Sequence, residues 1–138
     1  MSALERNKQL ARDFIAFMGA IDLEGMQDIL AEDLQYNIPN TGCTSGQLDR
    51  RRFLKTLAGL GMVCPGGVKF QVLDLTAEGD RVSIRVDGLA NLADGTPYNN
   101  RYHFLIKIRD GKIFEAYEYY DALLVENLIG PLLKKKPA

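Results

Sequence analysis

The sequence predicts an α+β fold, in which helices from the first half of the chain pack on an antiparallel sheet formed by the second half. Up to Gly67, apolar residues recur at the spacing of amphipathic helices. After Gly67, four strand-like runs are separated by short turns, two of which contain Asp-Gly. Asp-Gly between apolar runs is a strong hairpin signal, so we expect consecutive strands to be antiparallel neighbours.

Helix caps indicate where the first helices begin. Ser2 and Glu5 form the S-x-x-E pattern of a capping box, which predicts a first helix over residues 3–19. Asp22 fits the cap of a shorter second helix. A short strand over residues 33–39 follows, because a proline ends the extended run.

A third helix is expected between this strand and the sheet, with Phe53 on its inward face. After the last strand, Asp121 fits the cap of a final short helix that residues 130–131, Gly-Pro, would end. We interpret residues 1–138 as a single domain, with a loose C-terminal tail over residues 132–138.

The composition excludes several classes of partner. Apolar residues make up 46% and charged residues 25% of the chain, as in globular proteins, and the net charge of -1 argues against a nucleic-acid surface. No apolar run is long enough to span a membrane, and the early charged residues Glu5, Arg6 and Lys8 lead us to expect no signal peptide. Cys43, Cys64 and the lone His103 do not have the spacing of metal ligands. We therefore expect a cytoplasmic protein without metal or cofactor.

The turns also set the strand register, which decides which side chains share a face. A two-residue turn at residues 94–95 would pair Asp87 with Tyr102. A three-residue loop that includes Gly111 would pair Tyr102 with Glu118. This register predicts a row of Asp87, Tyr102 and Glu118 across three strands, on the face that the helices cover.

Such a row can perform acid–base chemistry. Two carboxyl groups in unequal surroundings can act as general acid and general base. Arg85 lies one diagonal step from the row and could bridge Asp87 and Glu118, which buried carboxylates require. In the alternative interpretation, Arg85 pairs with Asp74 on the neighbouring strand, and these charges form only an ion-pair network.

The stretch from Arg85 to Asp121, with its R-V-D, DGTPYNNRYHF, RDGKI and YEYYD segments, resembles the SnoaL-like and ketosteroid-isomerase-like members of the NTF2-like superfamily. The segment from Ala31 to Tyr36 and the preceding helices fit the same pattern. The resemblance implies a cone: a curved antiparallel sheet wrapped on three N-terminal helices, with an internal pocket for a hydrophobic small molecule. It also implies a homodimer.

A narrower resemblance is to limonene-1,2-epoxide hydrolase, which has an Arg-x-Asp pair, a water-positioning Tyr and a water-activating Asp. Arg85 and Asp87 match the pair, Tyr36 matches the Tyr, and Glu118 falls at the position of the Asp. The resemblance implies Glu118 as base, Asp87 as acid and Arg85 as the group that holds both. The chain departs from that pattern, because Glu118 is one methylene longer than Asp and Tyr102 adds a phenol.

The expected function is a small, cofactor-independent acid–base enzyme that acts on a hydrophobic molecule as an epoxide hydrolase, polyketide cyclase or isomerase. In a cyclase of the SnoaL type, Glu118 or Asp121 could supply the carboxylate. The alternative is a binding module without turnover. The residues expected to line the pocket are Phe14, Phe17, Phe53, Leu89, Asn100, Tyr102, Phe104, Ala116 and Tyr120.

Overall fold

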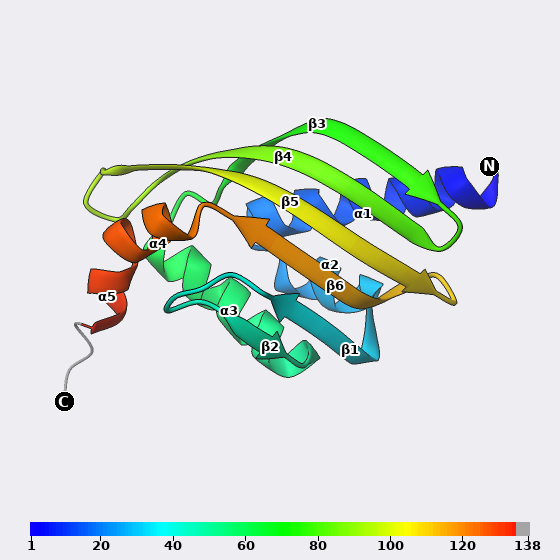
Figure 1. Cartoon of the computed structure of the whole chain (residues 1–138), viewed down its shortest axis with the longest axis horizontal. Coiled ribbons are helices and arrows are strands. Elements are labelled where there is room, and N and C mark those ends of the chain that lie inside the picture. The colour runs from blue at the N-terminus through cyan, green and yellow to red at the C-terminus, as the bar shows by residue number, and fades with distance from the viewer. Residues whose placement is uncertain (135–138) are drawn as a thin grey trace.

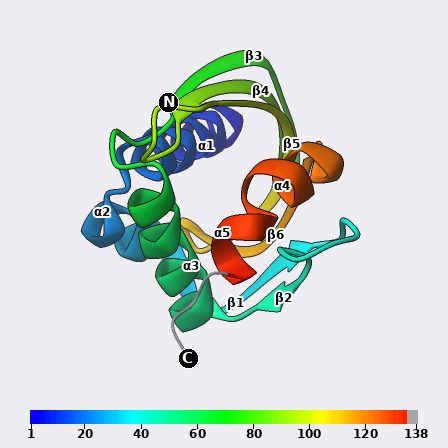
Figure 2. The same cartoon turned by 90° about the vertical axis from the view of Figure 1, so that its left-hand side faces the viewer.

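The computed structural model describes residues 1–134, and one curved sheet wraps around three helices there (Figure 1). The helices are α1 (Ala3–Ala20), α2 (Leu23–Ile29) and α3 (Arg50–Val63). The strands are β1 (Leu30–Ile38), β2 (Gly46–Leu48), β3 (Lys69–Glu78), β4 (Arg81–Asn91), β5 (Pro97–Arg109) and β6 (Lys112–Tyr120). Two short helices, α4 (Ala122–Leu128) and α5 (Gly130–Lys134), lie across one end of the curved sheet (Figure 2). The predicted α+β architecture is confirmed.

The predicted capping residues begin their helices. The Ser2 hydroxyl accepts a hydrogen bond from the Glu5 backbone N–H at 3.1 Å, and the Glu5 carboxylate accepts one from the Ser2 backbone N–H at 3.3 Å. Asp22 caps α2 by accepting from the Gly25 N–H at 2.9 Å. Asp121 caps α4 in the same way. These contacts satisfy N–H groups that have no partner within the helix.

The sheet is mixed, which corrects the expectation of a wholly antiparallel one. Its strand order is β2-β1-β6-β5-β4-β3, and β1 runs parallel to β6. A parallel pair needs a long crossover connection, and the segment between β1 and β6 supplies it through α3 and the three intervening long strands. The three-residue strand β2, which pairs with the end of β1, was not predicted.

The register between β4 and β5 differs from the predicted one. Asn91 pairs with Pro97 across the five-residue loop 92–96, so Asp87 lies opposite Arg101 rather than Tyr102. A slip of one residue turns every side chain of a strand to the other face of the sheet. The prediction that Asp87 shares a face with Tyr102 is therefore wrong.

The hydrophobic pattern of β4 explains the observed register. Val82, Ile84 and Val86 are fully buried against the helices, so Arg85 and Asp87 point to the outer face. Burial of each such apolar side chain stabilises the fold by about 1.5–3 kcal/mol, which outweighs the preference for a two-residue Asp-Gly turn.

The hairpin between β5 and β6 has a two-residue turn at Asp110 and Gly111, both with positive φ, rather than the predicted three-residue loop. A bulge at Phe114 then adds a residue to β6. Together, the shorter turn and the bulge shift the pairing by two residues, so Tyr102 lies opposite Tyr120 rather than Glu118. Because side chains alternate between faces, a shift of two residues leaves Glu118 on the inner face.

Gly88 makes room for an aromatic contact inside the sheet. A Cβ atom at this position would lie 2.9 Å from the Tyr102 ring and 3.0 Å from the Phe70 ring. These two rings meet edge to face, with centroids 5.3 Å apart and an interplanar angle of 83°. The absence of a side chain at Gly88 therefore fixes how Tyr102 enters the interior.

The last described residues overlap the predicted C-terminal tail. Residues 132–134, the first three of that tail, belong to α5. The rest of that prediction, residues 135–138, lies outside the described residues. Among residues 1–134, no helix combines the length and the apolar character needed to cross a membrane.

Candidate functional site

A cavity of about 480 Å³ lies between α3, the inner face of the sheet and the short helices α4 and α5. Its apolar walls include Met18, Leu48, Phe53, Leu60, Phe70 and Ile129. This volume is in the range of small-molecule sites, which combine apolar walls with a few polar groups.

Glu118 is the only carboxyl group that lines this cavity within the described part of the chain. Its side chain keeps some accessible surface because it faces the hollow, yet protein surrounds it on all other sides. Loss of solvation raises the pKa of Glu118 to about 7, although a hydrogen bond from Tyr36 favours the charged form and acts in the opposite direction. At neutral pH the carboxyl group therefore populates both protonation states.

Tyr36 holds Glu118 from the neighbouring strand. Its phenolic O–H donates to Glu118 Oε1. The ring is fully buried and stacks on Phe53, with centroids 4.0 Å apart. In the sheet, Tyr36 is paired with the small residue Ala116. Burial, and then the nearby carboxylate, raise the pKa of Tyr36 well above its usual value, so the phenol remains a neutral donor.

Further phenols line the cavity from β5 and β6. The Tyr102 O–H donates to the Tyr98 hydroxyl at 3.3 Å. The Tyr120 hydroxyl shares a hydrogen bond with the Thr44 hydroxyl in the loop after β1. The polar end of the cavity thus consists of one carboxyl group surrounded by neutral hydroxyl groups.

Asp121 is a structural residue next to this site. Its carboxylate accepts from the Leu124 N–H at 3.2 Å, which begins α4. The Asn100 side chain clamps the Asp121 backbone, accepting from its N–H at 3.0 Å and donating to its carbonyl at 3.3 Å. Of the two roles considered for Asp121, the structure shows the helix cap.

The structure brings together two of the four residues predicted to be catalytic. Tyr36 and Glu118 meet in the cavity, whereas Arg85 and Asp87 lie on the outer face of the sheet. Arg85 forms an ion pair with Asp74 at 2.8 Å, and both side chains are more than half exposed. The expected bridge from Arg85 to Glu118 does not exist, because the β4 register turns Arg85 away.

The predicted pocket residues fall into three groups. Those that line the cavity are Phe53, Tyr102 and Tyr120. Those that pack in the interior without lining it are Phe14, Phe17, Phe104, Ala116 and Asn100. Leu89 lies on the outer face of β4 and is 54% exposed, so its placement in the pocket is wrong for the same reason of register.

Sequence reasoning missed Tyr98, Thr44 and the side chains of α4 and α5 that line the cavity. Tyr98 carried a signal, because it lies four residues before Tyr102 on one strand and therefore on the same face. The contributions of Thr44 and of the short helices depend on chain packing and had no such periodic signal.

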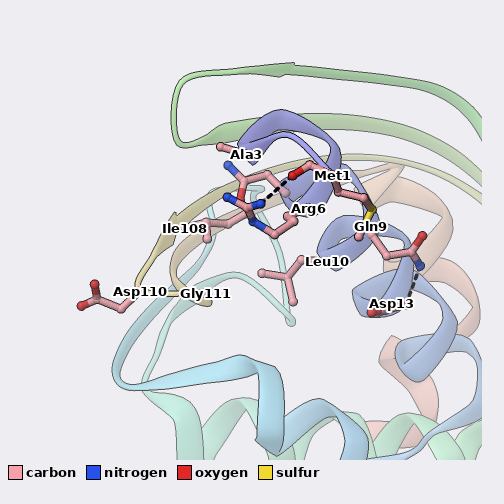
Figure 3. A pocket seen from close by; sticks show the side chains of 10 residues that line it. Met1, Ala3, Arg6, Gln9, Leu10, Asp13, Ile108, Asp110 and Gly111 are labelled. Carbon is pink, nitrogen blue, oxygen red and sulfur yellow. Dashed lines mark hydrogen bonds between the residues drawn. The ribbon is translucent and has the colours of Figure 1, made fainter.

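A second hollow of about 430 Å³ lies between the start of α1 and the β5–β6 turn (Figure 3). The Arg6 guanidinium donates to the Met1 carbonyl there at 2.6 Å, and Gln9 donates to Asp13 at 2.9 Å. The Arg6 side chain thus binds the backbone, the Gln9 and Asp13 side chains bind each other, and no carboxyl group is enclosed as Glu118 is. We therefore place the candidate site in the first cavity.

The described residues hold no group of three or more His, Cys, Asp and Glu side chains arranged to bind a metal ion. Of these residue types, Glu118 and the exposed Cys43 line the candidate site.

Comparison with known proteins identifies the family. Residues 11–116 match the profile of the SnoaL-like domain, which covers most of the chain. The chain belongs to the SnoaL-like domain family. The matched segment includes Tyr36 and ends just before Glu118. No curated protein sequence matches this SnoaL-like domain significantly.

Three solved structures illustrate the range of proteins that share this fold. PrhC from Penicillium brasilianum NBRC 6234 is 18% identical with a TM-score of 0.85, over 97% of this chain and 92% of that chain. IdmH from Streptomyces antibioticus, described as a candidate polyketide cyclase, is 18% identical with a TM-score of 0.75, over 90% and 98%. A candidate ketosteroid isomerase from Kribbella flavida DSM 17836 is 22% identical with a TM-score of 0.69, over 88% and 82%. At these identities the likeness shows the fold of the SnoaL-like domain.

Proposed function

We propose that this SnoaL-like domain is a cofactor-independent acid–base enzyme that acts on a hydrophobic small molecule, with Glu118 as the group that accepts and returns a proton. The observation that carries the proposal is the isolation of Glu118 in an apolar cavity, where its pKa is raised to about 7. A general base works best when its pKa lies near the operating pH. An exposed surface carboxylate would not meet this condition.

The proposed step is proton abstraction next to a carbonyl group of the ligand. The ionised Glu118 takes a proton from the carbon atom, and the electrons of the broken C–H bond move to the carbonyl oxygen and form an enolate. Tyr36 holds Oε1, which leaves Oε2 free to face the ligand. In a ligand whose C=C bond is conjugated with the enolate, Glu118 returns the proton to the far end of this dienolate and gives an isomerised product. Alternatively, the enolate carbon attacks a second carbonyl within the ligand and closes a ring, and Glu118 gives its proton to the alkoxide oxygen that forms.

Epoxide hydrolysis is not part of this proposal. The mechanism that the resemblance implied requires Asp87 as a second acid and Arg85 beside it, and both residues lie on the outer face. Within residues 1–134 the cavity contains a single carboxyl group, which cannot act at once as base for water and as acid for the epoxide oxygen.

The second candidate is a binding module that retains a hydrophobic ligand without turnover. The same observation favours it, because one carboxyl group among neutral phenols also suits a site that binds its ligand without converting it. The homodimer implied by the resemblance also stays a prediction, which light scattering on the purified chain can test.

Deuterium exchange separates the two candidates. α-Tetralone in deuterated water exchanges the protons next to its carbonyl, and proton NMR follows the rate. We expect the wild-type protein to accelerate this exchange and Glu118→Gln to lose at least about 100-fold of the acceleration. Asp87→Asn removes a carboxyl group from the outer face and is the matched control, with an unchanged rate.

Equal rates for wild type and Glu118→Gln would contradict the enzymatic proposal. Saturable binding of α-tetralone, with exchange no faster than in buffer, would support the binding module instead. The Asp87→Asn control distinguishes the loss of the Glu118 carboxyl group from a general effect of removing one negative charge.

A further inference from the structure

The phenols of the cavity differ in where their protons can go. Each phenolic hydroxyl has one proton to donate and two lone pairs that can accept. The Tyr36 proton goes to Glu118, and the Tyr120 hydroxyl has Thr44 as a partner that can take its proton. Both phenols are therefore satisfied without a ligand.

Tyr98 is different, because its hydroxyl accepts twice. It accepts from the Tyr102 O–H at 3.3 Å and from Asn100 Nδ2 at 3.0 Å. The orientation of the Asn100 amide is fixed, since its Oδ1 accepts from the backbone N–H groups of Arg101 and Asp121. Both lone pairs of the Tyr98 oxygen are thus used, and its own proton has no acceptor among residues 1–134.

The position of Tyr98 makes this proton relevant to a ligand. Tyr98 is 3% exposed and lines the cavity together with Tyr102 and Glu118. Glu118 is the diagonal neighbour of Tyr102 on the adjacent strand, a backbone separation of about 7–8 Å. The Tyr98 hydroxyl and the Glu118 carboxyl group therefore line one cavity.

We propose that the Tyr98 O–H donates a hydrogen bond to a carbonyl oxygen of the ligand, so that the cavity selects neutral hydrophobic ketones over hydrocarbons of the same shape. This inference rests on the proposed function of the cavity as a small-molecule site. The two hydrogen bonds that Tyr98 accepts polarise its O–H group and strengthen it as a donor. A buried donor without an acceptor destabilises the protein, so a ligand that supplies the acceptor gains more binding free energy there than at a donor that is already paired.

The charge of the cavity supports a neutral oxygen rather than a carboxylate. Glu118 is negative in part at neutral pH and would repel an anion. The cation of the lining, Lys55, is exposed on α3.

Binding of α-tetralone and of tetralin, which lacks the carbonyl, tests this inference. We expect Tyr98→Phe to weaken α-tetralone binding by about 3- to 12-fold and to leave tetralin binding unchanged. Tyr102→Phe is the matched control, because it removes a neighbouring phenol but leaves the Tyr98 proton, so its effect on α-tetralone should be smaller. Equal loss for both compounds in Tyr98→Phe would overturn the proposal.

The carbonyl stretching frequency of bound α-tetralone gives a second measurement that does not depend on how much protein folds. We expect a lowered frequency in wild type and in Tyr102→Phe, and a frequency typical of an apolar solvent in Tyr98→Phe. An unchanged frequency in Tyr98→Phe would overturn the role of Tyr98.

The two proposals fail separately. If Glu118→Gln loses exchange while Tyr98→Phe leaves the carbonyl frequency unchanged, the enzymatic proposal stands and the role of Tyr98 is wrong. If wild type gives no exchange but Tyr98→Phe removes the frequency shift, Tyr98 is a ligand donor in a binding module. If wild type binds neither compound, both proposals are overturned.

Discussion

The raised pKa of Glu118 predicts a pH dependence of stability. In the unfolded chain this carboxyl group loses its proton near its ordinary pKa of 4.5, whereas in the folded protein it keeps the proton up to about 7. Between these values the folded state binds the additional proton, so the free energy of unfolding falls as the pH rises, by up to about 1.4 kcal/mol per pH unit. The contribution is fully present below pH 4.5 and is lost as the pH passes 7. The whole interval amounts to roughly 3 kcal/mol.

Glu118→Gln isolates this effect, because glutamine stays neutral at every pH and other titrating groups are common to both proteins. Denaturant unfolding from about pH 4 to about pH 8 gives the free energy of unfolding of each. We expect wild type to lose roughly 3 kcal/mol relative to Glu118→Gln over this range. A difference that stays constant with pH would refute the reasoning, since it would mean that Glu118 ionises in the folded protein as it does in water.

Three further variants test the surroundings of the site. Tyr36→Phe removes a hydrogen bond that favours the charged form of Glu118, so the midpoint of the pH profile of exchange should move to higher pH; a lower midpoint would contradict the assigned hydrogen bond. Gly88→Ala places a Cβ 2.9 Å from the Tyr102 ring, and we expect a loss of about 1–3 kcal/mol in denaturant unfolding, whereas unchanged stability would show that the ring can move. Arg85→Ala breaks an exposed ion pair, so we expect the free energy of unfolding to change by at most about 1 kcal/mol. The rate of α-tetralone exchange should not change, and a loss of exchange would show that Arg85 takes part in the site.

Local signals in the sequence determined most of the element boundaries. The caps at Ser2, Asp22 and Asp121 act within one helical turn, so their side chains contact backbone groups that the sequence itself places nearby. The Asp-Gly turns likewise marked the ends of the strands at β4–β5 and β5–β6. In each case the physical cause and its effect are a few residues apart.

The candidate site was predicted in part. The register predicts an inward Glu118 and the family resemblance predicts a site role for Tyr36, and the structure places the two in contact. The two-residue turn predicts Arg85 and Asp87 on the same inner face as Glu118, whereas the observed register turns both to the outer face. In β4, apolar residues such as Val82 alternate with polar ones, and this pattern predicts that Arg85 and Asp87 face outward.

The sequence by itself determined that helices precede a set of hairpins and that the Glu118 carboxyl group points inward, because those features follow from caps, turns and periodicity, whereas Tyr36 was placed in the site by the family resemblance. Only the tertiary structure decided the register of β4 against β5, the parallel pairing of β1 with β6, and the closure of the cavity by α4 and α5. These features depend on which apolar surfaces bury one another across distant parts of the chain, and that choice also leaves Glu118 as the cavity's carboxyl group within residues 1–134.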